Sequence, residues 1–169
     1  AITRLVAPVL LVAFLDGCSQ PATPDVRFTT LDGQTTPLSA LRGKVVLVNF
    51  WATTCTTCVA EMPQLVDTYN KFAPRGFETV AVAMSYDPAD YVRNYATKNA
   101  LPFKVTLDTD GSAAKGFEDV RLTPTTFLID KQGRVVQKYL GAPDFPKLHA
   151  LLDKLLRSEE HTSELQSHH

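Results

Sequence analysis

Residues 45–58 read VVLVNFWATTCTTC, and this stretch decides the fold. Its first half, Val45–Trp51, is a nearly continuous apolar run of strand length, a pattern typical of a parallel strand buried on both faces. Cys55 and Cys58 follow directly, and apolar residues then recur with the period of an α-helix over residues 59–72. The stretch therefore predicts a central strand that leads through a CxxC motif into a helix.

The spacing and position of the two cysteines favour redox chemistry. Residues three apart on a helix share a face, so the two sulfurs can close a small ring. Unpaired N–H groups and the macrodipole at a helix N-terminus stabilise an anion, so Cys55 should be partly thiolate and attack a partner's disulfide. Cys58 lies one turn deeper, is shielded, and would resolve the mixed disulfide.

Two other interpretations of the CxxC motif stay open. A zinc or copper site needs further soft ligands, and besides the pair the reliable part of the chain offers only Cys18 and His149. We therefore expect no metal ion and no other cofactor. A static disulfide clip would close only a tiny loop, which limits the stability it could add.

The segments around this stretch alternate between strand and helix patterns. Pro63 should kink the helix that follows the cysteines, because proline removes one backbone donor. Asp87 and Pro88 form a good cap and first-position pair for a helix over 88–99. The other expected elements are a hairpin over 26–37, a helical turn at 38–41, strands at 77–84 and 105–107, a short helix over 112–117, a hairpin over 125–140 and a closing helix over 145–156. This order predicts an α/β domain of three layers with a central mixed sheet.

Composition limits the size of the domain and its partners. The chain has 169 residues, of which 44% are apolar, so it can build one sizeable core but not two ordinary domains. Its formal charge is -1, so no basic excess indicates nucleic acid as a partner. We expect a monomer.

The N-terminal segment predicts export. Arg4 precedes a short apolar run, too short to span a bilayer, and Leu15-Asp16-Gly17-Cys18 follows. This break resembles a bacterial lipobox, although Asp16 departs from the usual small or apolar residue. We expect a signal peptide over 1–18, lipidation of Cys18, a polar tether over 19–25 and a domain over 26–156, which would make a lipoprotein anchored in the cell envelope on the periplasmic side. The alternative for Cys18 is a spare buried cysteine.

The C-terminal residues 157–169 resemble a translated sequencing adapter rather than a native tail. Three of the four histidines lie there, so we do not count them as metal ligands.

Two separated motifs resemble the TlpA/ResA-like family of membrane-tethered thiol–disulfide oxidoreductases. The first is LSALRGKVVLVNFWAT at 38–53, ahead of CxxC, and the second is VRLTPTTFLID at 120–130. The resemblance implies a thioredoxin-like fold with an N-terminal β-hairpin and an extra strand–helix insertion before the strand that follows Pro124. It also implies a reductase of protein disulfides, of the kind used in cytochrome c maturation or oxidase assembly, with an upstream electron donor in the membrane.

The same resemblance assigns roles to single residues. Pro124 would be the family's cis-proline, with Thr123 offering its backbone to the substrate; the alternative is an ordinary proline at the start of a strand. Glu61 would exchange protons with Cys58, or else merely favour the helix N-terminus. Trp51 is either a wall of the substrate site or a core residue.

Further residues separate this chain from other assignments. Asn49 stands where cytosolic thioredoxins carry a buried aspartate, which leaves Glu61 as the proton carrier; alternatively, Asn49 only hydrogen-bonds within the sheet. Thr56 and Thr57 between the cysteines leave the reduction potential open. Asp119 weakens an assignment specific to haem-attachment cysteines, because cytochrome c maturation members often carry glycine there.

Two other functions are weighed against the reductase. The first is a peroxidase. Peroxiredoxins carry Pro and Thr at fixed positions ahead of the reactive cysteine, whereas this chain has Val48 and Ala52 at those positions, which argues against this function. The second is a copper chaperone, which would need a third copper ligand besides the two cysteines. His149 is expected on a helix surface.

Overall fold

The computed structural model describes residues 23–157. The predictions for the signal peptide, Cys18 and residues 158–169 therefore lie outside the described residues. Arg157, assigned above to the tail, is the last residue of the final helix. Within residues 23–157, no helix is both long and apolar enough to cross a membrane.

The elements follow the predicted order. They are β1 (Arg27–Thr29), β2 (Thr35–Pro37), the 3-10 helix η1 (Leu38–Leu41), β3 (Val45–Trp51), α1 (Thr56–Phe72), the 3-10 helix η2 (Ala73–Arg75), β4 (Phe77–Ala83), α2 (Ala89–Lys98), β5 (Lys104–Leu107), α3 (Ser112–Gly116), β6 (Thr125–Ile129), β7 (Val135–Leu140) and α4 (Phe145–Arg157). β1 and β2 form a separate antiparallel hairpin, and the other strands form a five-stranded mixed sheet in the order β5-β4-β3-β6-β7. This is the thioredoxin-like arrangement that the resemblance predicted, with a strand–helix pair, β5 and α3, before β6.

Strand β3 lies at the centre of the sheet because both of its faces are apolar. It pairs in parallel with β4 and antiparallel with β6, and its residues are all buried. Val45, Leu47 and Trp51 face one apolar cluster, whereas Val46 and Phe50 face the other. Alternation along a strand sends successive side chains to opposite faces, so one strand supports both cores.

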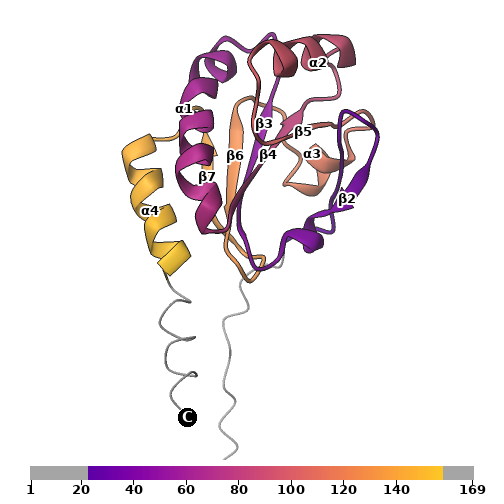
Figure 1. Cartoon of the computed structure of the whole chain (residues 1–169). Helices are drawn as coiled ribbons and strands as arrows, with labels where there is room; N and C mark the ends of the chain where they lie inside the picture. Colours follow the sequence, from indigo (N-terminus) through magenta and orange to yellow (C-terminus); the bar gives the residue numbers. More distant parts are fainter. Residues whose placement is uncertain (1–22, 158–169) are drawn as a thin grey trace, which may run out of the picture.

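Helices and the hairpin cover the two faces of the sheet (Figure 1). α1 and α4 pack on the first face, and Val92 of α2 joins the same cluster. α3 and the N-terminal segment, including Phe28 of β1, cover the second face. The result is three layers with the sheet in the middle.

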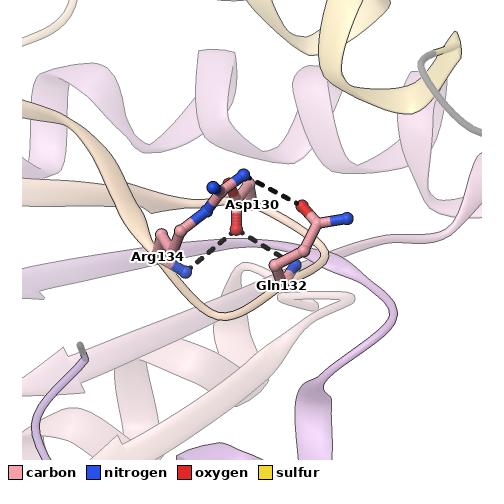
Figure 2. Close-up of polar contacts among 3 residues, drawn as sticks. All are labelled: Asp130, Gln132 and Arg134. Carbon is pink, nitrogen blue, oxygen red and sulfur yellow. Dashed lines mark hydrogen bonds and ion pairs between the residues drawn. The ribbon is translucent and has the colours of Figure 1, made fainter. Parts of the chain in front are cut away.

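Different loops lie at the two ends of the strands, which we call the two edges of the sheet. At the edge where β3 and β4 end and β6 begins, the loops 52–55, 84–88 and 117–124 come together; we call it the disulfide edge. At the opposite edge, which we call the turn edge, Asp130 closes the β6–β7 turn (Figure 2). Its carboxylate accepts the N–H groups of Gln132 and Arg134 and pairs with the Arg134 guanidinium at 2.8 Å.

Two local expectations need comment. Pro63 does not interrupt α1, which runs without a break for 17 residues. The predicted cap of the next helix was wrong, because Pro88 occupies the N-cap position of α2 and no side chain caps the helix. The Asp87 carboxylate binds elsewhere, as described below.

Candidate active site

Cys55 and Cys58 form a disulfide at the start of α1, with their Cα atoms 5.2 Å apart. Cys55 is the N-cap residue and is partly exposed, whereas the Cys58 side chain is fully buried. The backbone N–H of Cys58 donates to the Cys55 sulfur at 3.2 Å. The strand-to-helix transition thus presents one sulfur to the surface and holds the other inside.

This position sets the chemistry of Cys55 once the disulfide is reduced. The N-terminus of a long helix carries unpaired N–H groups and a positive partial charge, both of which stabilise a thiolate. The N–H of Cys58 already points at the Cys55 sulfur in the oxidised form. The geometry therefore supports Cys55 as the nucleophile and Cys58 as the resolving thiol.

The loop before β6 lies beside β3 at the disulfide edge. The Thr123–Pro124 peptide bond is cis. Its place is fixed by neighbouring hydrogen bonds, because Gly141 N donates to Pro124 O at 2.9 Å and Thr125 Oγ1 donates to Leu122 O at 2.6 Å. Thr123 is half-buried and lies two residues before β6, which pairs with β3, the strand that leads to Cys55.

A buried polar group lies behind the disulfide. Glu61 is one turn beyond Cys58 on α1 and only 3% exposed. The Asn49 amide, from β3, donates to Glu61 Oε1 at 3.1 Å and to Thr126 Oγ1, on β6, at 2.9 Å. Both N–H bonds of the amide are therefore used, and the three side chains connect α1 to the two central strands.

Burial controls the ionisation of this carboxyl. It raises the pKa of Glu61 from 4.5 to about 7, and the hydrogen bond from Asn49 opposes part of that rise. Glu61 Oε2 has no hydrogen-bond partner among the described residues. A carboxyl with a pKa near neutrality and a free oxygen can take up and release a proton at the pH where thiol exchange occurs.

Trp51 lies in the core, and His149 lies between two helices. Trp51 has no exposed surface and packs against Tyr95 with ring centroids 5.2 Å apart, which favours the core interpretation over a wall that touches the substrate. His149 does not lie free on the surface of α4. Its Nε2 is 2.8 Å from Thr68 Oγ1 of α1, so it joins the two helices far from the cysteines.

The sequence pattern missed the role of Asp87. Its carboxylate accepts the backbone N–H and the hydroxyl of Thr53, each at 2.7 Å, and Asp87 is only 7% exposed. Thr53 lies two residues before Cys55, so the loop after β4 holds the loop that presents the nucleophile. Asp before Pro indicates the start of a helix from neighbouring residues alone. Thr53, the partner of Asp87, is 34 residues away in the sequence, so this pattern could not show the contact.

Among residues 23–157, no cluster of three or more His, Cys, Asp or Glu side chains has a geometry suited to a metal ion.

Comparison with known sequences gives consistent matches across the domain. The Redoxin family profile matches residues 19–152. The chain is 36% identical over 133 residues to the thiol-disulfide oxidoreductase ResA of Bacillus thuringiensis strain Al Hakam, covering 78% of this chain and 75% of the relative. It is 33% identical over 136 residues to ResA of Bacillus subtilis strain 168, covering 80% and 75%.

Solved structures show the same fold. A candidate thioredoxin from Neisseria meningitidis superimposes with a TM-score of 0.74 at 36% identity, covering 89% of this chain and 97% of the other. A thiol:disulfide interchange protein of the thioredoxin family from Chlorobium tepidum gives a TM-score of 0.74 at 26% identity, covering 83% and 99%.

Proposed function

This chain belongs to the Redoxin family and, within it, to the ResA-like thiol–disulfide oxidoreductases, and from that premise we propose that it reduces disulfides of partner proteins in the bacterial cell envelope. The observation that carries the proposal is the asymmetric cysteine pair. Cys55 is partly exposed at a helix N-terminus, whereas Cys58 is fully buried one turn behind it. Such a pair can form a mixed disulfide with one partner through Cys55 and release that partner when Cys58 attacks the Cys55 sulfur.

The proposed reaction conserves atoms and electrons. The Cys55 thiolate attacks one sulfur of the partner's disulfide, forms a mixed disulfide and releases the partner's other sulfur as a thiolate that takes up a proton. Cys58 then loses its proton and attacks the Cys55 sulfur, which releases the second partner thiol. The partner gains two electrons and two protons, and the chain ends with the Cys55–Cys58 disulfide. An upstream dithiol donor, which we place in the membrane, must reduce that disulfide again.

Glu61 supports the reducing direction. The disulfide of a cysteine pair is a strong oxidant when the reduced, thiolate form is stabilised, as the helix N-terminus does here. The Glu61 carboxylate, when ionised, opposes a second negative charge on nearby Cys58 and so destabilises the reduced form. We propose that Glu61 also accepts the Cys58 proton during resolution.

A redox titration tests the direction. Equilibration of the protein with glutathione mixtures should give a reduction potential below about -230 mV, the range of reductants rather than of oxidants of folding proteins. A potential above about -150 mV would instead assign the protein to disulfide formation.

The cis-proline loop is the proposed contact for the partner backbone. Thr123 is half-buried two residues before β6, and β6 pairs with β3, the strand that leads to the loop of Cys55. An extended partner segment could pair with Thr123 as an added strand does. Because Pro124 has no N–H to donate, we propose that Thr123 makes the backbone hydrogen bonds to the partner segment.

The envelope location rests on the N-terminal sequence. Residues 1–18 have the pattern of a signal peptide that ends in a lipobox, and we propose that lipidated Cys18 anchors a monomeric domain to the membrane. Mass spectrometry of the mature N-terminus from membranes tests this. An unmodified Cys18 would remove the anchor without affecting the redox proposal.

Trapping of mixed disulfides tests the roles of the two cysteines. Cys58→Ser should accumulate a covalent adduct with a protein disulfide, because the nucleophile is present and the resolving thiol is missing. Cys55→Ser is the matched control and should form little or no adduct, since buried Cys58 cannot reach a partner. Adducts on Cys58 in the Cys55→Ser protein, or none in either variant, would contradict the assignment.

A further inference from the structure

Basic residues concentrate at the turn edge of the sheet. Four short segments meet there: the loop before β3 (42–44), the end of α1 with η2 and the start of β4 (71–78), the β6–β7 turn (130–134) and the last turn of α4 (153–157). We call these four segments the basic end. Its cations are Arg42, Lys44, Lys71, Arg75, Lys131, Arg134, Lys154 and Arg157, and its acids are Glu78, Asp130 and Asp153.

Polar contacts between the four segments make the basic end one continuous surface. The backbone N–H of Gly43 donates to the carbonyl of Lys131 at 2.9 Å, which joins the loop before β3 to the β6–β7 turn. Lys131 Nζ donates to the carbonyl of Leu156 at 3.3 Å, which joins that turn to the end of α4. Arg75 of η2 forms an ion pair with Asp153 of α4 at 2.5 Å. Segments far apart in the sequence are therefore held side by side.

The acids of the basic end present little negative charge to solvent. Asp130 is buried, and its carboxylate binds Arg134 and the N–H groups of its own turn (Figure 2). Glu78 is also buried and forms an ion pair with Lys104 of β5 at 3.6 Å. Asp153, the third acid, is half-buried and is held by η2 as described above. The outer surface of the basic end is therefore cationic.

The cations of the basic end are not balanced locally. Arg42, Lys44 and Lys154 are exposed, and none of them forms an ion pair within residues 23–157. The rest of those residues has the opposite balance, with eight basic and eleven acidic side chains. Of these acids, Asp90 and Asp110 are exposed near the disulfide edge. The domain therefore carries a dipole whose positive end is the turn edge.

The chain enters the described domain at the same surface. Thr23, the first described residue, lines a small hollow together with Arg42 and Gly133. A Cβ added to Gly133 would lie 3.2 Å from Arg42 Nε and 3.7 Å from Thr23 Oγ1. Cys18 is five residues earlier in the sequence, so a lipid there would attach within roughly 18 Å of the basic end. The anchor and the cations are therefore on the same side of the domain.

From this arrangement we propose that the basic end docks on the anionic phospholipid headgroups of the membrane that holds the anchor. The proposal rests on the proposed function only through the anchor at Cys18. Each cation near an anionic membrane surface strengthens binding about fivefold. The tether keeps this surface close to the bilayer and so raises the effective concentration of headgroups around it. An acidic protein would suit the same charge, but nothing in the chain brings one to this side.

Docking fixes the orientation of the redox site. The seven residues of β3 separate the basic end from the loop of Cys55, so the sulfur lies about 23 Å from the docked surface. The acids near the disulfide edge are repelled by the same headgroups, which turns the dipole in the same sense. The disulfide therefore faces the aqueous compartment and not the headgroups.

Lysine reactivity on vesicles tests the proposal. The full chain is purified from membranes with its cellular N-terminus and reconstituted in phosphatidylcholine or in an equimolar mixture of phosphatidylcholine and phosphatidylglycerol. A membrane-impermeant amine reagent at limiting dose then labels the lysines, and mass spectrometry quantifies each one. We expect Lys44 and Lys154 to react about fivefold more slowly on the anionic vesicles, whereas Lys147 at the start of α4 reacts equally on both. High salt should remove the difference, because it screens the attraction.

Charge-reversal variants locate the effect on the basic end. Arg42→Glu/Lys44→Glu should abolish the protection of Lys154 on anionic vesicles, because two attractive charges become repulsive. Lys98→Glu/Lys147→Glu is the matched control, since it makes the same change of net charge at exposed positions outside the basic end. That control should keep the protection of Lys154. Circular dichroism confirms that each variant is folded.

The outcomes separate this proposal from the proposed function. Equal reactivity of Lys154 on the two kinds of vesicle, or protection that survives the reversal of Arg42 and Lys44, would overturn the docking and leave the oxidoreductase intact. A chain that sediments with neither kind of vesicle would overturn the anchor and the docking together. Failure of the reduced protein to reduce 2,2′-dipyridyl disulfide, measured separately in solution, would overturn the proposed function.

Discussion

At the residue scale, the buried carboxyl of Glu61 makes stability depend on pH. Its carboxyl is buried behind the disulfide, where the charged form is disfavoured, and Asn49 supplies one hydrogen bond. A group whose pKa is raised by folding stabilises the folded chain while it is protonated. That contribution is fully present below the unfolded-state value and is lost as the pH rises through the folded-state value.

The pH dependence of stability follows from this shift. For the oxidised protein, the contribution of Glu61 should fall between about pH 4.5 and about pH 7, because the unfolded chain loses the proton first. Glu61→Gln cannot ionise, so its free energy of unfolding relative to wild type should change by on the order of 3 kcal/mol across that window. Urea denaturation at several pH values measures this difference.

A matched variant controls for general charge effects. Asp67→Asn removes an exposed carboxyl from the same helix and should follow the wild-type pH dependence. If the curves of Glu61→Gln and wild type run parallel, folding does not raise the pKa of Glu61, and its proposed role as a proton carrier near neutral pH fails.

The sequence predicted part of this chemistry. Cys55 and Cys58 were predicted from their spacing at the start of a helix, whereas Glu61 was assigned its role by the family resemblance. Asn49 was noted only for replacing an aspartate, and its contacts with Glu61 and Thr126 required the pairing of β3 with β6. Trp51 could not be assigned, because an aromatic residue at the end of a buried strand suits both the core and a site wall.

At the element scale, the loop before α1 and the loop before α2 are held together. Asp87 in the second loop accepts two hydrogen bonds from Thr53 in the first. Charged acceptors in partly buried places form the stronger hydrogen bonds of proteins. The position of Cys55 therefore depends on a side chain that belongs to a different element.

Removal of this carboxylate should affect both stability and activity. Asp87→Ala leaves the Thr53 N–H without its acceptor and should cost about 2–3 kcal/mol of unfolding free energy. It should also slow reduction of small disulfides, because the Cys55 loop loses its support. Asp90→Ala is the control, since that exposed acid only favours the start of α2 and should cost less than about 1 kcal/mol. Equal losses in the two variants would mean that the Thr53 contact is unimportant.

The elements themselves were predictable because periodicity and turn residues are local signals. Every predicted helix and strand of the domain is present, with ends that differ by a few residues. The α2 cap was wrong because Asp87 has a stronger partner in another loop. Local signals describe what a segment can do alone, and competition from distant partners decides the rest.

At the scale of the whole molecule, the N-terminal segment closes the second face of the sheet. Val26 and Phe28 are buried in the cluster that contains Phe50 and Phe127. A side chain on Gly116 would meet Val26 directly, since an added Cβ would lie 2.6 Å from its Cγ2. This close approach fixes the segment against the end of α3.

A double-mutant cycle measures that contact. Gly116→Ala should destabilise the protein by about 1–3 kcal/mol, because the new methyl group forces Val26 away. In a Val26→Ala background the space is free, so the same change should be neutral or stabilise by up to about 1 kcal/mol, since alanine is the better helix former. Urea denaturation gives all four free energies. Additive effects would show that the segment adjusts without cost.

The assembly of the molecule was less predictable than its parts. The strand order makes β5 an outer strand of the sheet, and Thr106 of β5 also forms a β-bridge with Thr30, next to the hairpin. No spacing in the sequence indicates that contact, nor the hydrogen bonds between Asp87 and Thr53. Both arise when segments far apart in the chain reach the same end of the sheet.

The position of Thr23, the first described residue, bears on how far Cys55 can lie from a membrane anchor. Thr23 lies beside Gly133 in the β6–β7 turn, at the end of the sheet opposite Cys55. The strand between these ends, β3, has seven residues, so the reactive sulfur is about 23 Å farther along than the attachment point. If a lipid on Cys18 fixes the start of the tether, five extended residues add at most roughly 18 Å. The sulfur would then reach at most about 40 Å from the bilayer surface, so the disulfides of its partners must come within that distance of the membrane.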